Sequence, residues 1–327
     1  MSAATAQRPA TVRRSDLRFK FGLNARAVLG RAYPRVIGAN REPSWVVFEV
    51  FLPLLGIAAY VFIYQAFYGA QIAAIHAGQC PSGPCASPAD QLAALQAAGS
   101  QLNAYIATVV LGGTMVAFWL NVLWSMASQL YWEKEIGNLQ IYMMAPMSRM
   151  ALLAGMAIGG MFMTSVRALS TLVAGILVFG VVFQVADPWM LLAVFFVTLV
   201  ALYGMGMMFA SLYLLWGREA WNLSALLEEP IFFSSGMYFP AGGLFLIPTW
   251  GPAVAIAGSI VPAMLGLDAL RQLTLPAGTA PLPILPPATE LGLLLGLAVL
   301  FLVLARFALA YLETLAKREG KLTSRHQ

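Results

Sequence analysis

The stretch YWEKEIGNLQIYMMAP, residues 131–146, is a short charged island between two long apolar runs. Glu133, Lys134 and Glu135 follow one another within it, whereas the runs on either side consist mainly of aliphatic and aromatic residues. Consecutive charges are costly to place inside a lipid bilayer. We therefore expect the island to lie on the water side, between two segments that cross the membrane.

The island has the spacing of a short helix with two different faces. Residues at i, i+3 and i+7 share one face of a helix. In this stretch they are the apolar residues Ile136, Leu139 and Met143. A second face consists of Glu133, Gly137 and Gln140. Pro146 ends the helix, because proline removes a backbone hydrogen bond. Two interpretations remain open: a solvated connector, and a helix that presents its apolar face to a partner.

The composition of the whole chain is that of an integral membrane protein. Of its 327 residues, 60% are hydrophobic and only 10% are charged, and the mean hydropathy is +0.77. Soluble domains carry about 25% charged residues. The net charge of +5 would suggest a nucleic-acid partner in a soluble chain, but here its distribution matters more than its sum. The first long apolar run begins near Trp45, too late for a cleavable signal peptide.

Six apolar stretches are each near or above the roughly 20 residues that cross a bilayer. They are 45–68, 103–131, 157–184, 189–216, 221–239 and 288–312. Six crossings place both termini on the same side. The segments on that side hold nearly all the basic residues outside the spans: 1–44, 132–156, 217–220 and 313–327. The opposite loops hold Arg271 alone. The excess of positive charge predicts cytoplasmic termini in a plasma or inner membrane.

The N-terminal part, residues 1–44, is basic and includes an amphipathic helix from Phe21. One side of this helix is apolar: Phe21, Ala25, Val28, Leu29, Ala32 and Val36. Arg26, Arg31 and Arg35 lie off that side. The pattern predicts a helix in the cytoplasmic membrane interface with its arginines toward lipid phosphates. A soluble helix on a protein partner is the alternative. A six-span domain, 45–312, and a basic cytoplasmic tail, 313–327, follow.

Two outer segments are unusual. Segment 69–102 contains Cys80 and Cys85 in the sequence CPSGPC. Disulfides persist outside the cytosol, and Pro and Gly between the cysteines favour a turn, so we expect a disulfide there, with two free thiols as the alternative. Segment 240–287 is apolar but interrupted by prolines and glycines. It is typical of short half-helices that re-enter the outer leaflet before the last span. The predicted fold is therefore an all-α membrane protein.

Charged and polar residues inside the expected spans are functional candidates by default. The charged ones are Glu49, Arg167, Glu228, Glu229 and Arg306. We expect an ion pair between Arg306 and one of the two adjacent glutamates. Polar residues also form two stripes at helical spacing. They are Thr114, Asn121, Ser125 and Ser128 on the second span, and Ser224, Glu228 and Ser235 on the fifth. Such stripes either line a translocation path or make hydrogen bonds between helices.

Motifs of nucleotide hydrolysis and of metal or serine hydrolases are absent from the sequence. No G-x-x-x-x-G-K-[ST], H-E-x-x-H or G-x-S-x-G occurs, and the two histidines lie far apart. These motifs mark phosphate, zinc and nucleophile sites. We therefore expect no catalytic residues, metal or cofactor on this chain. Any energy that it uses would come from a partner or an ion gradient.

Several short motifs occur in an order that resembles a known family. The first cytoplasmic loop carries Glu135, Gly137, Leu139, Ala145 and Pro146. The later motifs are Ser235-Gly236, Phe239-Pro240, Ile247-Pro248-x-Trp250, Pro262 and Asp268-Ala269-Leu270-Arg271. From about residue 20 onward, this order resembles the permease subunits of ABC type-2 exporters, which include drug, lipid, lipo-oligosaccharide and polysaccharide exporters.

The resemblance implies that loop 132–148 is a coupling helix seated in a cleft of a separate P-loop ATPase subunit, present in two copies. The implied coupling residues are Glu133, Glu135, Gly137, Leu139, Met143 and Pro146. ATP and Mg²⁺ would bind that subunit rather than this chain. A second permease subunit, identical or homologous, would complete the pathway, in contact with membrane lipids and without nucleic acid.

The cargo suggested first is an amphipathic drug or lipid, which an outer-leaflet re-entrant region and an apolar lumen between two subunits would suit. A polysaccharide exporter is an alternative, in which Phe118, Trp119 and Trp124 would line the path. A proton-coupled carrier that uses Glu228 and Glu229 is an alternative from another class, and an assembly factor without transport is a third. An ATP-hydrolysing subunit that co-purifies with the chain would favour the exporter.

Overall fold

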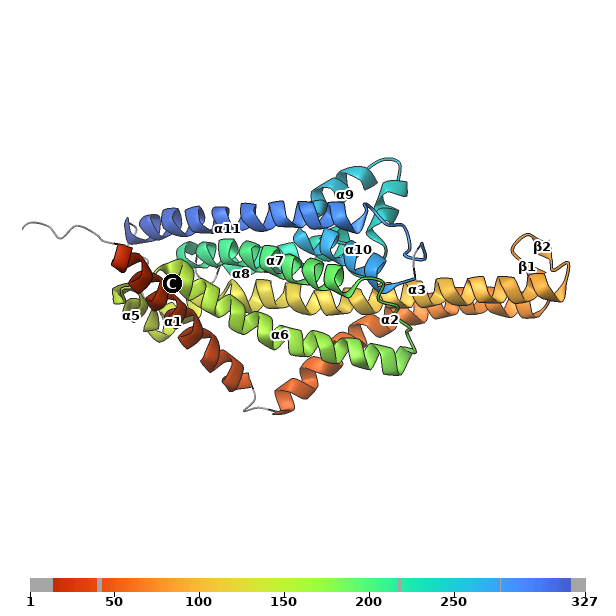
Figure 1. Cartoon of the computed structure of the whole chain (residues 1–327), viewed down its shortest axis with the longest axis horizontal. Helices are drawn as coiled ribbons and strands as arrows, with labels where there is room; N and C mark the ends of the chain where they lie inside the picture. Colours follow the sequence, from red (N-terminus) through yellow and green to blue (C-terminus); the bar gives the residue numbers. More distant parts are fainter. Residues whose placement is uncertain (1–13, 40–42, 217–218, 277, 319–327) are drawn as a thin grey trace, which may run out of the picture.

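Long helices that run roughly along one direction dominate the structure, a computed structural model that describes residues 14–39, 43–216, 219–276 and 278–318 (Figure 1). The elements are α1 (Arg14–Ala39), α2 (Pro43–His76), β1 (Gln79–Cys80), β2 (Gly83–Pro84), α3 (Pro88–Leu120), the π-helix η1 (Asn121–Met126), α4 (Gln129–Ile136), α5 (Asn138–Met144), α6 (Arg149–Phe179), α7 (Pro188–Trp216), α8 (Ala220–Ser234), the 3-10 helix η3 (Ala241–Leu246), α9 (Gly251–Ser259), α10 (Pro262–Thr274) and α11 (Pro287–Arg318). The described residues are therefore all-α apart from one two-stranded hairpin.

Five of the described helices are long and apolar enough to cross a membrane. They are Leu54–His76, Pro88–Ile136, Arg149–Phe179, Pro188–Tyr213 and Pro287–Leu315. They correspond to the six expected spans except the fifth, 221–239. α9 and α10 pass the same test only as a pair, and they meet at an angle of 94°. The chain thus has the helices of a membrane-embedded protein.

The expected fifth span, 221–239, is not one continuous helix. α8 has 15 residues, which is fewer than the roughly 20 that a crossing needs. It ends at Ser234, and Gly236 follows with a φ of +61°, a conformation that glycine adopts without steric cost. The chain therefore turns where the sequence predicts the span to continue.

Local signals in the sequence account for the ends of two long helices. Ser148 precedes α6, and its side chain accepts a hydrogen bond from the Ala151 amide, which satisfies one free donor of the first turn. Gly180 ends α6 in the left-handed conformation, as is common at helix C-termini. At the start of α3, Ser87 accepts a hydrogen bond from the Asp90 amide in the same way.

The core lies where α3, η1, α6, α7, α10 and α11 meet. α11 packs along α7, and α3 packs against both α2 and α6. Trp119, Phe118 and Tyr203 are among the largest side chains that this packing buries completely. Phe118 and Trp119, which the sequence suggested for the lining of a glycan path, both lie inside this core.

α2 and α3 form a long antiparallel hairpin that extends beyond the other helices, with β1 and β2 at its tip (Figure 1). At the tip, a disulfide joins Cys80 to Cys85, in the segment where the sequence predicts one. Cys80 pairs with Gly83 across the two strands. The Gln91 side chain donates a hydrogen bond of 2.7 Å to the Ile75 carbonyl, so a side-chain contact also joins the two helices below the strands.

Gly112 sets the approach of α3 to the turn that follows α8. A Cβ atom on Gly112 would lie only 1.4 Å from the carbonyl oxygen of Met237. Gly99, which also lies on α3, has no atom within 4 Å of the position where its Cβ would be. The two glycines therefore offer a matched pair for testing the packing.

We predict that Gly112→Ala lowers stability and that Gly99→Ala does not. The first change forces backbone apart in the core, which costs about 1–3 kcal/mol or more. The second replaces an exposed helical glycine by alanine, which stabilises a helix by roughly 0.5–1 kcal/mol. Thermal unfolding of the two variants in detergent measures the difference. Equal unfolding temperatures would contradict the packing of α3 against residues 236–237.

Candidate functional site

The N-terminal helix α1 lies directly on α6, because α6 presents two glycines to it. A Cβ atom on Gly155 would lie 2.7 Å from the carbonyl oxygen of Val28, and one on Gly159 would lie 3.2 Å from that of Ala32. Side chains at these positions would hold the helices apart. The side of α1 that faces away from α6 carries exposed apolar side chains, among them Tyr33 and Ile37.

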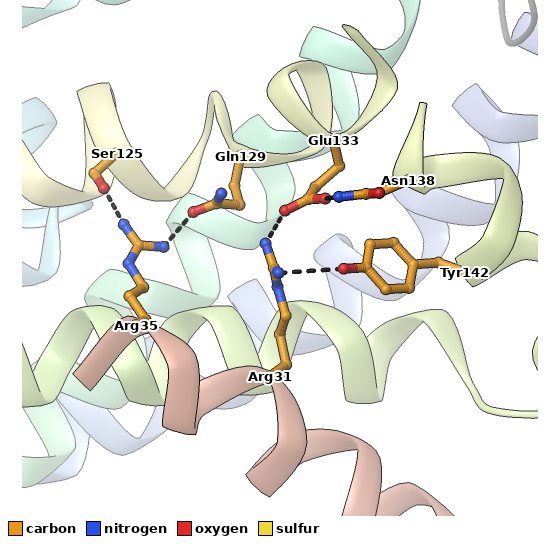
Figure 2. A network of polar contacts seen from close by, with 7 residues as sticks. All are labelled: Arg31, Arg35, Ser125, Gln129, Glu133, Asn138 and Tyr142. Carbon is orange, nitrogen blue, oxygen red and sulfur yellow. Dashed lines mark hydrogen bonds and ion pairs between the residues drawn. The ribbon is translucent and has the colours of Figure 1, made fainter. Parts of the chain in front are cut away.

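Arg31 of α1 forms a partly buried ion pair with Glu133 of α4 (Figure 2). Its guanidinium also donates a hydrogen bond of 3.2 Å to the Tyr142 hydroxyl and lies 5.6 Å from the centre of that ring. Asn138 donates to the second carboxylate oxygen of Glu133 at 3.1 Å. Glu133 is only 4% exposed, so its charge is balanced by protein groups rather than by water.

Arg35, one helical turn further along α1, donates hydrogen bonds to the side chains of Gln129 and Ser125 (Figure 2). Burial lowers the pKa of the Arg35 guanidinium, and the positive charge of Arg31 acts in the same direction. Burial also raises the pKa of the Tyr142 hydroxyl, and Arg31 opposes that shift. The hydrogen bonds offset part of the cost of burying these groups.

These contacts correct the orientation expected for α1. Arg31 and Arg35 point into the protein rather than toward lipid phosphates, whereas Arg26 is exposed. The reason is that the polar partners of these two half-buried arginines lie on η1, α4 and α5, directly opposite the helix. The exposed apolar side of α1 still has the character of an interfacial helix.

The island 131–146 forms two short helices rather than one. Gly137 separates α4 from α5 and has a φ of +90°, which a helix cannot accommodate and which favours glycine. The turn changes the direction of the chain, so residues before and after it no longer share one face. Leu139 is consequently 4% exposed and part of the core, whereas Ile136 is exposed. The side chain of Met143 lies outside the described residues.

Leu139 is therefore not an available anchor for a partner, contrary to the expectation from spacing. The exposed surface of the island carries different apolar side chains: Trp132, Ile136, Ile141 and Met144. Glu135 is half-buried at this surface, and Gln140 and Pro146 are exposed. We call these residues the α4–α5 surface. The sequence does hold a signal for this arrangement. Gly137 interrupts the helical pattern, and a break there places Ile141 and Met144, instead of Leu139, at the surface.

The polar stripe of the second span points toward three different neighbours. Asn121 accepts a hydrogen bond of 2.8 Å from the Tyr203 hydroxyl of α7, and Ser125 accepts one from Arg35. Ser128 donates to the Trp124 carbonyl at 2.6 Å. Asn121 and Ser125 lie in the π-helix η1, whose wider turn changes the spacing of side chains. The stripe was expected either to line a translocation path or to make hydrogen bonds. In the structure, all three residues make hydrogen bonds within the protein.

The polar residues expected on the fifth span are divided among several surroundings. Ser224 is buried and shares a hydrogen bond of 2.7 Å with the Tyr213 hydroxyl. Glu228 is half-buried and accepts a hydrogen bond of 2.9 Å from the Trp124 indole. Ser235 is fully buried, and its hydroxyl has no hydrogen-bond partner within the described part of the chain.

The ion pair expected for Arg306 is not formed. Within the described residues no ion pair joins Arg306 to Glu228 or Glu229, and the side chains of Arg306 and Glu229 are exposed. The reason is the packing: α11 lies along α7, whereas α8 contacts η1 and α9. Of the other intramembrane candidates, Arg167 is half-buried on α6, and the side chain of Glu49 lies outside the described residues.

Comparison with known proteins does not identify a family. No protein-family model matches the chain, and no curated protein matches its sequence. Inference about function therefore rests on the residues and their geometry.

We predict that Arg31→Ala lowers the free energy of unfolding by about 3 kcal/mol, because it leaves the Glu133 carboxylate buried without its cation. Adding Glu133→Gln should restore part of the loss. Arg26→Ala, which removes an exposed arginine from the same helix, should have little effect. Denaturant unfolding in detergent gives the values for Arg31→Ala, for Glu133→Gln alone, for the double variant and for Arg26→Ala. If the double variant merely sums the two single effects, the proposed coupling is absent.

Proposed function

We propose that this chain is the membrane-spanning permease subunit of an ATP-driven exporter of the ABC type-2 class. In this proposal the α4–α5 surface binds a separate P-loop ATPase subunit. The observation that carries the proposal is the combination of an exposed apolar surface on two short helices with a partly buried ion pair behind it. ATP and Mg²⁺ would bind the ATPase, and this chain would supply the pathway.

The α4–α5 surface has the composition of a protein-binding site. Ile141 and Met144 are 61% and 78% exposed. The preceding helix α4 carries charged residues, and both helices lie at one end of the molecule (Figure 1). Exposed apolar side chains with a polar rim are typical of interface anchors. Glu135 and Gln140 beside them would orient the partner.

The contacts behind this surface make it suitable for transmitting force. Arg31 joins α1 to both α4 and α5 through Glu133 and Tyr142. α1 in turn lies against α6 at Gly155 and Gly159. A displacement of α4 and α5 by the ATPase would therefore also move α1 and α6. This arrangement supports a coupling role over a solvated connector, which needs no such contacts.

The topology that goes with this function has six crossings. We propose that α2, α3, α6, α7 and α11 span the bilayer and that α8 completes the fifth crossing together with the turn after Ser234. η3, α9 and α10 would then re-enter the outer leaflet, as the bend of 94° between α9 and α10 suggests. Both termini would be cytoplasmic, in a plasma or inner membrane.

The cargo that we propose is an amphipathic drug-like molecule or lipid, moved at an interface between two permease subunits. A cavity of about 300 Å³ beside the proposed re-entrant segment supports this class. Its lining is aromatic or aliphatic and includes Tyr105, Phe233, Phe239, Leu244 and Ile247. Such a lining suits an apolar group, whereas a glycan would need more hydrogen-bonding partners.

We predict that the double variant Ile141→Lys, Met144→Lys no longer retains its ATPase subunit. Two apolar anchors are worth about 1.5–3 kcal/mol each, so the loss corresponds to roughly 100-fold weaker binding or more. The tagged chain is purified from its native host, and P-loop ATPase subunits are quantified by mass spectrometry. Thermal stability should stay unchanged, since both side chains are exposed.

Two control variants make this experiment specific. Leu92→Lys changes an exposed leucine near the tip of the α2–α3 hairpin and should leave the ATPase bound. Leu139→Ala removes a core side chain and should lower stability by about 2–5 kcal/mol. An ATPase that stays bound to the double lysine variant at the wild-type level would exclude the α4–α5 surface as its binding site.

The proposed topology places Cys80 and Cys85 outside the cytosol. We predict that a membrane-impermeant thiol reagent labels them in intact cells only after reduction, because their disulfide leaves no free thiol. The measurement is gel-shift labelling with and without a reductant. Labelling that requires permeabilised cells would place the hairpin tip in the cytosol and reverse the proposed orientation.

A further inference from the structure

Three ionisable side chains are buried where α10 meets the start of α11, far along the molecule from α4 and α5 (Figure 1). They are Asp268, Arg271 and Glu290, each at most 2% exposed. Buried ionisable groups need partners that balance their charge or share their protons. The partners of these three groups differ, and the differences identify the role of each.

The Arg271 guanidinium is directed at backbone carbonyls. It donates hydrogen bonds to the carbonyl oxygens of Gly236 at 2.8 Å, Thr108 at 3.1 Å and Phe239 at 3.2 Å. These carbonyls belong to α3 and to the turn after α8. Arg271 therefore holds α10 against that turn, and its hydrogen bonds do not go to a carboxylate.

Asp268 accepts two hydrogen bonds through the same oxygen, Oδ2. The donors are the Gln272 side chain at 3.0 Å and the Ile284 backbone amide at 2.8 Å. Gln272 also donates to the Leu285 carbonyl at 2.7 Å. Asp268 thus links α10 to the segment that leads into α11.

Glu290 has the opposite environment. It is fully buried, and neither of its carboxyl oxygens has a hydrogen-bond donor in bonding geometry within the described residues. The Asp268 carboxyl group lies near it. Two ionised carboxylates this close would repel each other. A protonated Glu290 would instead donate its hydrogen to Asp268.

We propose that Glu290 and Asp268 share one proton and form a proton-binding site between α10 and α11. The other titratable or charged groups near the pair are Arg271 on the same helix as Asp268 and Tyr64 on α2, which lies near Arg271. With the proton bound, α11 is joined to α10. When the proton leaves to water, two negative charges face each other and separate the first turn of α11 from Asp268. This proposal does not depend on the exporter function.

Infrared difference spectroscopy of the purified protein in lipid nanodiscs tests the shared proton. Raising the pH of the wild type should remove the carbonyl band of one protonated carboxyl group, and the band should shift in deuterium oxide. Glu290→Gln should abolish it. Glu229→Gln, which removes an exposed glutamate of α8, should leave it intact. A band that persists in Glu290→Gln would overturn the proposal.

Thermodynamic linkage gives a second readout. The folded pair holds a proton that the unfolded chain releases above about pH 4–5, where free carboxyls ionise. The unfolding constant of the wild type should therefore rise about tenfold per pH unit from there until the folded pair loses its proton. Glu290→Gln should lack this contribution. An identical pH dependence in the two proteins would contradict a shared proton.

Asp268→Asn covers the case in which Glu290→Gln does not fold. The asparagine amide can donate a hydrogen bond to an ionised Glu290, so the protonated carboxyl band and its pH dependence should both disappear. A band retained at full intensity in Asp268→Asn would show that Glu290 is protonated without Asp268 and would overturn the sharing. These measurements involve neither an ATPase nor transport, so their failure is distinguishable from that of the proposed function.

Discussion

The ion pair between Arg31 and Glu133 connects two parts of the chain that are far apart in sequence and belong to different elements. A carboxylate as buried as Glu133 would be costly without a cation, so α4 depends on α1 for its position. α1 in turn requires the small surface of Gly155 and Gly159 to come close enough to reach Glu133. The exposed surface of α4 and α5 thus has its shape because of contacts on its buried side.

Polar groups inside an apolar bundle need partners within the protein, and this requirement applies along the whole molecule. Asn121 bonds to Tyr203, Glu228 bonds to Trp124, and Arg271 bonds to backbone carbonyls. Each contact joins two elements that apolar packing alone would leave free to slide. Polar side chains in this protein therefore specify which helices are neighbours.

Hydropathy was sufficient to predict an all-α membrane protein and five of its long helices, because the cost of exposing polar backbone to lipid leaves few other folds. The orientation of side chains was less predictable. Leu139 was wrongly expected at the surface because the φ of Gly137 cannot be inferred from helical spacing. The pairing expected for Arg306 was wrong because it depends on which helices pack together. The contact between Asp268 and Glu290 likewise depends on the path of the chain between α10 and α11.

The contact of α1 with Gly155 and Gly159 of α6 affects the order in which the protein is assembled. α1 is made first, but Gly155 and Gly159 are synthesised more than one hundred residues later. At about 5–20 residues per second, that interval is on the order of ten seconds. During this time Arg31 has neither Glu133 nor a glycine surface beside it. The apolar side of α1 allows the helix to stay at the membrane surface during this time, and α1 reaches its final place only after α6 has been made.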